Sequence, residues 1–159
     1  MNKAKDKKFL ERAIELSREG MKAGNGGPFG CVVVLGDEIV GEGCNQVTSS
    51  NDPTAHAEVV AIRAACKKLN TYQLNDCEIY TSCEPCPMCL GAIYWARPKR
   101  VVYANTREEA AAIEFDDDFI YQEINAKMNE RKIPFIHHPH PMAKQIFEEW
   151  KNWEGKIKY

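Results

Sequence analysis

Apolar residues recur every three to five positions in several parts of the chain, and each recurrence predicts an amphipathic helix. In the first of these segments, from about 5 to 22, Phe9, Ala13 and Leu16 share one face, and the glycine-rich run 24–28 ends the helix. The same spacing predicts further helices at about 53–69, 87–96, 107–128 and 142–153, with a break at the acidic residues 116–118 in the longest.

Runs of β-branched residues predict the strands. Residues 29–35 form such a run, Gly36 and Asp37 are typical of a hairpin turn, and residues 38–44 return as a second strand. Shorter apolar runs predict three more strands, at about 77–82, 101–104 and 133–136. Strands that alternate with helices indicate a layered α/β domain with part of its sheet parallel, and the hairpin makes the sheet mixed.

Length and charge narrow the class of protein. A chain of 159 residues has the length of one domain, so we expect a single domain over 1–159. The formal net charge of −2 argues against a protein whose main role is to bind nucleic acid. No apolar run approaches the ~20 residues that span a bilayer, and the basic N-terminus is not followed by the apolar region of a secretory signal. We therefore expect a cytoplasmic protein without membrane contact.

The seven cysteines favour a reducing compartment, because their number is odd and the chain is long enough to fold without disulfides. Four of them stand alone in apolar stretches and are interpreted as buried core residues: Cys31, Cys44, Cys66 and Cys77. The other three, Cys83, Cys86 and Cys89, fall within seven residues and are candidates for metal binding.

Two of these cysteines have the spacing of a zinc half-site. Proline is favoured at the first position of a helix, so Pro87 makes Cys86 the N-cap and puts Cys86 and Cys89 on one face of the first turn. The helix dipole favours their thiolate forms there. His56 supplies a third ligand, and three protein ligands leave a position open for water, as in catalytic zinc sites.

Glu58 follows His56 by two residues, which is about 200° around a regular helix. We therefore interpret Glu58 as a neighbour of the bound water, in the position of a general acid and base, and not as a ligand. Two other interpretations remain open. Cys86 and Cys89 alone could form a redox pair, and a closed structural site could include Cys83, although Pro85 disturbs the local geometry.

The combination H-x-E…P-C-x-x-C is the motif of the zinc nucleobase deaminases. Four longer segments resemble the cytidine and nucleotide deaminase superfamily, and within it the bacterial guanine deaminases: GGPFG at 26–30, NDPTAHAE at 51–58, YTSCEPCPMC at 80–89 and GAIYWAR at 91–97. The resemblance covers about 9–121 and is looser from 125 to 159.

The resemblance implies a three-layer α/β/α fold with a five-stranded mixed sheet, usually in a homodimer. It implies one zinc ion on His56, Cys86 and Cys89, with Glu58 as the proton shuttle. The implied reaction is the hydrolytic deamination of guanine, a small purine, to xanthine and ammonia.

Several residues have positions suited to base recognition. Asn45 carries both a donor and an acceptor for a purine edge, Phe29 and Trp95 can stack on the ring, and the amide of Ala57 can bond the base. Core packing is the alternative for both aromatic residues. Asp117 resembles the acid that accepts a ring N–H in guanine-type enzymes, but the run 114–118 reads EFDDD, so that Asp116 and a solvated acidic turn are alternatives.

The C-terminal residues can also serve the site. The chain ends in Tyr159, as guanine-type relatives often do, and in some relatives the C-terminal segment, here about 141–159, closes over a pocket of the same or the other subunit. The alternative is a frayed terminus. The histidine-rich tract 137–140 is interpreted as an ordinary loop, with metal binding as the alternative.

Other functions of the same scaffold remain open. The substrate could be guanosine, cytosine or an adenosine in tRNA, or the chain could be a zinc module without activity. The basic groups near both termini are interrupted by acidic residues, so we expect no specific tRNA binding at physiological salt.

Overall fold

The computed structural model describes residues 3–115 and 117–159. Its sheet has four strands, β1 (Gly30–Leu35), β2 (Glu38–Cys44), β3 (Cys77–Cys83) and β4 (Arg100–Asn105), in the order β2-β1-β3-β4. β1 is antiparallel to both β2 and β3, whereas β3 and β4 are parallel, so the predicted mixed sheet is confirmed. β1 is buried on both faces, which explains its unbroken apolar sequence.

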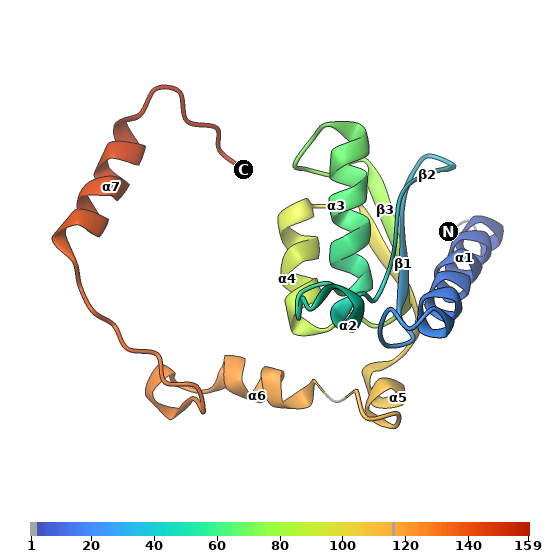
Figure 1. Ribbon diagram of the computed structural model, residues 1–159. Coiled ribbons are helices and arrows are strands. Elements are labelled where there is room, and N and C mark those ends of the chain that lie inside the picture. Colours follow the sequence, from blue (N-terminus) through green and yellow to red (C-terminus); the bar gives the residue numbers. More distant parts are fainter. Residues whose placement is uncertain (1–2, 116) are drawn as a thin grey trace. The chain divides into compact units, whose positions relative to one another are not determined.

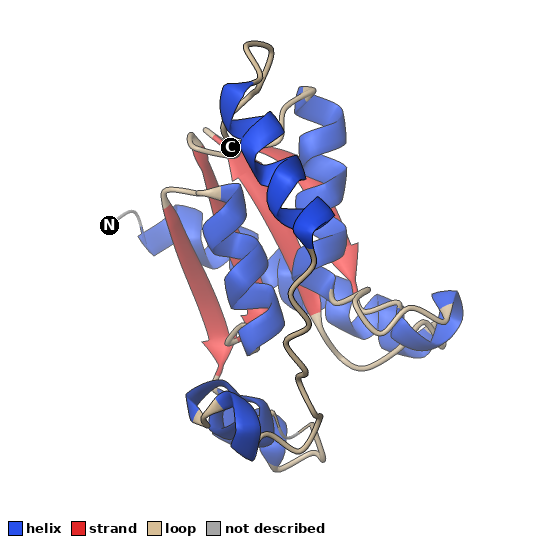
Figure 2. Ribbon diagram, turned by 90° about the vertical axis from the view of Figure 1, so that its left-hand side faces the viewer, coloured by secondary structure: helices blue, strands red, loops and turns tan. Residues whose placement is uncertain are grey.

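Helices cover both faces of this sheet (Figures 1 and 2), so the expected three-layer α/β/α arrangement is confirmed. On one face, α1 (Lys3–Lys22) packs through Phe9 against Val32, Val34 and Tyr80. On the other face lie α3 (Ala57–Leu69) and α4 (Pro87–Ala96), and their core includes Val33 of β1. The alternation of neighbouring β1 residues between the two cores is the two-residue period of a strand.

The helix α3 lies directly on β2 because both elements are lined by small residues. Its buried face consists of alanines and Glu58. A Cβ on Gly43 would lie 2.4 Å from the carbonyl oxygen of Ala57, and one on Gly41 would lie 2.4 Å from that of Ala61. This close approach fixes the depth at which the first turn of α3 sits over the sheet.

The loop before α3 is more structured than the sequence suggested. A short helix, α2 (Val47–Ser50), occupies part of the expected polar loop, and α3 begins four residues later than the predicted start at 53. Between them, the Asp52 carboxylate accepts hydrogen bonds from the Thr54 amide (2.8 Å) and hydroxyl (2.7 Å). This turn holds the chain out of the helix until His56.

The helix predicted at 107–128 is interrupted, as expected, but the interruption starts before residue 116. The segment forms α5 (Arg107–Ala111), α6 (Asp118–Asn125) and the 3-10 turn η1 (Met128–Glu130). The break begins before the acidic run, where Glu114 adopts a left-handed φ of 72°. The capping box of Thr106 and Glu109 fixes the start of α5.

The chain divides into two compact units, one ending at Asp118 and the other running from Phe119 to Tyr159. In the second unit, α7 (Pro141–Asn152) begins as predicted within one residue, with His140 as its N-cap. Neither α6 nor α7 contains a buried residue, and Ile146 and Phe147 of α7 are 53% and 78% exposed.

The predicted fifth strand at 133–136 is wrong, because these residues form no strand and the sheet of the described residues has four. Pro134 removes a backbone donor from this short segment. The side chains of Ile133 and Ile136 are 72% and 87% exposed, so no packing supports a strand there. No helix of the described residues has the length and apolar character needed to cross a membrane.

Candidate metal centre and active site

His56 is the N-cap of α3, with φ −70° and ψ 155°. The turn at Asp52 delivers it to this position, and its amide donates to the carbonyl of Thr54 (2.8 Å). The residue is half-buried. Because the N-cap residue is not helical, its side chain is free to leave the direction that a regular helix would impose.

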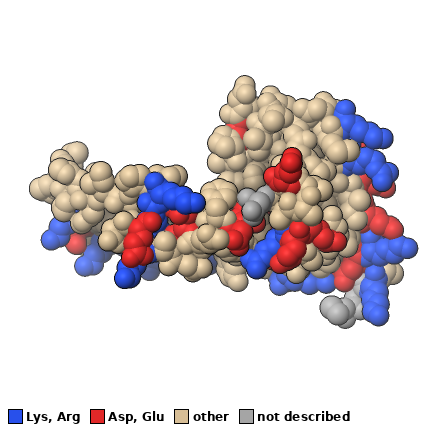
Figure 3. All heavy atoms as spheres, turned by 90° about the horizontal axis from the view of Figure 1, so that it is seen from below, with Lys and Arg blue, Asp and Glu red and all other residues tan. Residues whose placement is uncertain are grey.

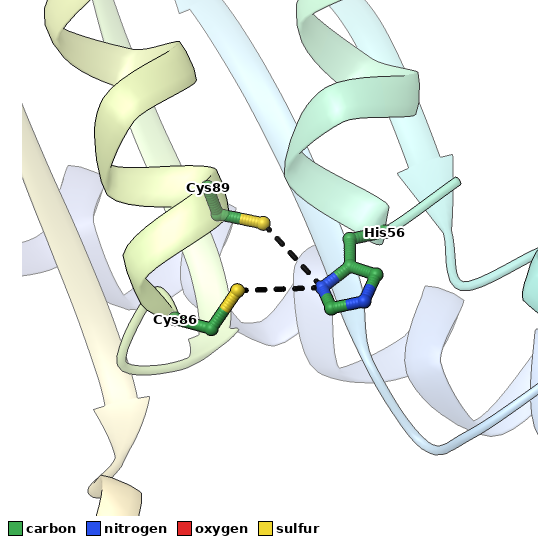
Figure 4. Close-up of side chains that lie close together, drawn as sticks. All are labelled: His56, Cys86 and Cys89. Carbon is green, nitrogen blue, oxygen red and sulfur yellow. Dashed lines mark hydrogen bonds between the residues drawn. The ribbon is translucent and has the colours of Figure 1, made fainter. Parts of the chain in front are cut away.

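Cys86 and Cys89 lie at the start of α4 as the sequence predicted. Cys86 is the N-cap, Pro87 follows at the first helical position, and Leu90 donates its amide to the Cys86 carbonyl (2.8 Å). Cys86 is half-buried and Cys89 is fully buried. Figure 4 shows the two thiols and the ring of His56 pointing toward one another from the first turns of α4 and α3.

The distances between these three side chains fit a zinc ion. The Nδ1 atom of His56 lies 3.5 Å from the Sγ atom of Cys86 and 3.6 Å from that of Cys89. Zinc bonds of about 2.3 Å to sulfur and about 2.0 Å to nitrogen at tetrahedral angles separate such ligands by roughly 3.6 Å. The three ligand atoms all lie within 4.8 Å of one another. The set therefore suits zinc and provides three protein ligands.

The electrostatics of the cluster favour a thiolate at Cys86. A hydrogen bond from Cys89 and the neighbouring ring of His56 lower the pKa of Cys86 to about 4. The hydrogen bond with Cys86 in turn raises the pKa of His56. A site that stabilises a thiolate is prepared to bind a metal ion, because the thiolate is the form of cysteine that binds metal.

Glu58 lies beside the cluster in a buried position, 6% exposed. Its Oε1 atom accepts from the Thr81 hydroxyl (3.2 Å) and its Oε2 atom from the Cys89 thiol (3.3 Å). Burial raises the pKa of Glu58. A buried carboxyl group beside a metal site is suited to accept and release a proton.

The angle of about 200° between His56 and Glu58 does not apply in the structure. It assumed a regular helical turn, whereas His56 precedes the helix and Glu58 is its second residue. His56 and Glu58 therefore both contact the thiol of Cys89, and their side chains face the same site. Glu58 nonetheless lies outside the set of three grouped ligand atoms.

Cys83 does not join the metal-ligand group among the described residues. Its thiol donates to the carbonyl oxygen of Thr106 (3.6 Å), and burial raises its pKa to about 11. The closed four-ligand site that the sequence left open is therefore not formed. All seven cysteines are free thiols.

The structure brings part of the predicted base-binding set to this region. Asn45 is buried at the end of β2, and its Oδ1 atom accepts from the amide of Val47 (3.1 Å). Ala57, the first residue of α3, is buried next to His56. Asp117 lies close enough for its charge to contribute to the raised pKa of His56. Asp116 lies outside the described residues.

The predicted aromatic residues have different surroundings. Phe29 is half-buried, and its ring meets that of Phe115 edge-on with centroids 4.9 Å apart, a contact that the sequence did not indicate. Trp95 in α4 is 65% exposed, so its alternative role in the core is wrong. Tyr159 belongs to the second unit and is 68% exposed.

Two contributions to the site escaped sequence reasoning. The contact between Thr81 and Glu58 joins residues 23 positions apart, and only the position of Thr81 within the segment 80–89 hinted at it. A Cβ on Gly26 would lie 2.1 Å from the Oδ1 atom of Asn45, so the absence of a side chain at 26 makes room for the Asn45 amide.

The histidine-rich tract is not grouped as a metal site among the described residues. His137, His138 and His140 line a surface hollow with Phe147, and the His140 ring accepts from the amide of Met142 (3.3 Å). The interpretation of this tract as an ordinary loop and helix cap is therefore supported.

Comparison with known proteins agrees with this geometry. A family model described as the cytidine and deoxycytidylate deaminase zinc-binding region matches residues 3–105. A guanine deaminase of Bacillus subtilis (strain 168) is 58% identical over 151 residues, covering 95% of this chain and 97% of the relative. A tRNA-specific adenosine deaminase of Aquifex aeolicus is 38% identical over 60% of this chain and 63% of its own length.

A solved structure extends the likeness to the whole chain. The crystal structure of guanine deaminase from Bacillus subtilis superimposes with a TM-score of 0.94 and 56% identity, over 100% of this chain and 99% of that one. The family match spans all four strands and both helices that carry the metal ligands. The chain therefore belongs to the cytidine and deoxycytidylate deaminase family of zinc-binding proteins.

Proposed function

We propose that this protein is a zinc-dependent guanine deaminase, which adds water to guanine and releases xanthine and ammonia. The observation that carries the proposal is the convergence of His56, Cys86 and Cys89 beside the buried carboxyl group of Glu58. The choice of guanine rests on the Bacillus subtilis relative, which is similar over nearly the whole chain.

When bound by His56, Cys86 and Cys89, zinc supplies the Lewis acidity that lowers the pKa of a water molecule toward about 7. Glu58 is placed to accept a proton from the water that would attack C2 and to deliver this proton to a ring nitrogen of the base. The carboxylate would then take the second proton from the hydroxyl group added at C2 and pass it to the amine, which leaves as ammonia as the C2–O double bond forms. The burial of Glu58 excludes bulk water from these transfers.

Asn45 is suited to the acceptor edge of a purine. Because a backbone amide can only donate, the Val47 amide fixes the Asn45 oxygen toward itself, which leaves the side-chain N–H groups for the base. We assign the remaining contacts to the ring of Phe29, the amide of Ala57, the carboxylate of Asp117, and the side chains of Trp95 and Tyr159.

Replacement of Glu58 by glutamine tests the shuttle. We expect Glu58→Gln to lower kcat by about 10²–10⁴-fold, measured by the ultraviolet absorbance of guanine, because glutamine cannot transfer the proton. Zinc content should stay at one per chain. Glu38→Gln, at the exposed start of β2, is the control and should match the wild type. Loss of zinc together with activity would instead make Glu58 a ligand or a structural group.

A tRNA substrate is the principal alternative. Against it, the tRNA-specific relative from Aquifex aeolicus is 38% identical to this chain, whereas the guanine deaminase of Bacillus subtilis is 58% identical. Basic and acidic side chains are also intermingled on the face in Figure 3, with no single patch of positive charge for phosphates. Guanosine, cytosine and tRNA should be turned over far more slowly than guanine. Tight, salt-sensitive tRNA binding would contradict this assignment.

The C-terminal unit is proposed to complete the site in a homodimer, by exchange of about residues 141–159 between subunits. In support, α7 leaves Ile146 and Phe147 exposed, so it needs a partner surface. Deletion of residues 158–159 should sharply reduce activity while the chain stays folded, as judged by circular dichroism, and Tyr159→Phe should separate the ring from its hydroxyl. Unchanged kinetics after the deletion would exclude a role for the tail.

A cytoplasmic location is also proposed. The metal site requires Cys86 and Cys89 as thiolates, and oxidation of this pair would remove both ligands. A reducing compartment keeps them available. The seven free cysteines are consistent with such a compartment.

A further inference from the structure

The hydroxyl of Thr81 stands between the proposed proton shuttle and a fixed backbone carbonyl. Thr81 lies in β3 and is 1% exposed. Its Oγ1 atom is 3.2 Å from the Oε1 atom of Glu58 and 3.4 Å from the carbonyl oxygen of Gly30. A buried hydroxyl with two acceptors in reach has one proton to give and can direct it to either.

The carbonyl of Gly30 lies one residue beyond the ladder between β1 and β3. The pairing runs from Cys31 opposite Thr81 to Leu35 opposite Cys77. Beyond it, the Gly30 amide donates to the Ser82 hydroxyl (3.0 Å), and its carbonyl faces Thr81. Gly30 is also held from behind, since a Cβ there would lie 2.1 Å from the carbonyl oxygen of Ala13. The acceptor is therefore rigid.

This arrangement serves both protonation states of Glu58. When Glu58 is a carboxylate, Thr81 donates its proton to Oε1. When Glu58 carries a proton on Oε1, that proton is donated to the Oγ1 atom of Thr81, and the Thr81 proton turns to the Gly30 carbonyl. Only the hydroxyl rotates, and Glu58 and Thr81 stay hydrogen-bonded to each other in both states.

The other contact of Glu58 does not persist through catalysis. The Cys89 thiol donates to Oε2. A cysteine that ligates zinc is a thiolate and has no proton to donate. Of the two side chains that the described residues place against the carboxyl group, Thr81 therefore remains as a donor when zinc is bound.

We propose that Thr81 is a positioning residue that holds the carboxyl group of Glu58 in one place beside the metal ligands. The proposal rests on the proposed function, because it assigns Glu58 the shuttle role. It makes the hydroxyl group, and not the volume of the side chain, the feature that matters at position 81.

Two substitutions at this position separate the hydroxyl from the volume. Thr81→Val keeps the shape and removes the hydroxyl, whereas Thr81→Ser keeps the hydroxyl. We expect Thr81→Val to lower kcat about 10–100-fold with little change in KM, because the carboxyl group loses its fixed position. Thr81→Ser should stay within about threefold of the wild type. The matched control is Thr71→Val, whose hydroxyl serves only a local turn with Gln73.

Zinc content, thermal unfolding and a crystal structure of zinc-loaded Thr81→Val complete the test. We expect one zinc per chain and a displaced Glu58 carboxyl group. Equal loss of kcat in both variants, a rise in KM alone, loss of zinc, or an unmoved carboxyl group with unchanged kcat would overturn the proposal. If the wild type fails to convert guanine while the carboxyl group moves in Thr81→Val, the proposed substrate is wrong and the positioning role stands.

Discussion

Replacement of Gly43 by alanine tests whether the packing of α3 on β2 sets the geometry of the site. The added Cβ would lie 2.4 Å from the carbonyl oxygen of Ala57 and 2.7 Å from the amide nitrogen of Ala61. Ordinary contact begins near 3.4 Å, so the first turn of α3 must move by about 1 Å. That turn carries Glu58 and directly follows His56.

The expected cost has two parts. Overpacking of a tight core typically destabilises a protein by about 1–3 kcal/mol, which lowers the melting temperature by roughly 2–12 °C for a chain of this size. Displacement of catalytic groups by about 1 Å typically reduces the rate about 10²-fold, which corresponds to ~2.7 kcal/mol of activation free energy. We therefore expect both Tm and kcat to fall.

The assay is guanine turnover followed by ultraviolet absorbance, together with thermal unfolding and zinc analysis. Gly91→Ala is the matched control, because a Cβ at this helical position of α4 meets nothing within 4 Å. It should raise Tm slightly, since alanine favours a helix over glycine by about 0.5–1 kcal/mol. A Gly43→Ala protein with reduced Tm and unchanged kcat would refute the link between helix position and catalysis.

Two further predictions concern Asn45 and Glu78. Gly26→Ala should displace the Asn45 amide, whose Oδ1 atom would lie 2.1 Å from the new Cβ, and raise the KM for guanine more than it changes kcat, as measured by steady-state kinetics. The free energy of unfolding should depend on pH through Glu78, because a hydrogen bond from Arg100 lowers the pKa of Glu78 from 4.5 to about 2. The folded state favours the ionised form of Glu78. Its contribution to the free energy of unfolding is therefore complete above pH 4.5 and is lost as the pH falls toward 2. The difference in unfolding free energy between the wild type and Glu78→Gln should shrink across this window. A difference that stays constant with pH would contradict the assignment.

The features that local sequence determines were predictable. The β-branched run of β1, the turn at Gly36 and the return of β2 specify a hairpin through neighbouring residues alone. Pro87 likewise specified the cap at Cys86, and with it the shared face of two thiols. Because neighbouring residues alone place these two thiols, they can be predicted as metal ligands before the fold is known.

The features that depend on distant partners were not predictable. The direction of His56 depends on a turn that Asp52 stabilises outside the helix, so helical geometry gave the wrong angle. The apolar run at 133–136 looked like a strand, but no neighbouring strand pairs with it among the described residues. The contact of Thr81 with Glu58 exists only once α3 and β3 have come together in the folded domain.

The metal ligands come from distant parts of the chain, and this affects the amount of the protein in the cell. His56 and Cys86 are 30 residues apart in the chain and meet only when α3 and α4 have docked on the sheet. An ion that binds this site binds the native chain in preference to the unfolded one and so stabilises it by mass action. Scarcity of zinc would then increase the unfolded fraction that proteases degrade. The abundance of the protein, and not only its activity, should follow the zinc supply.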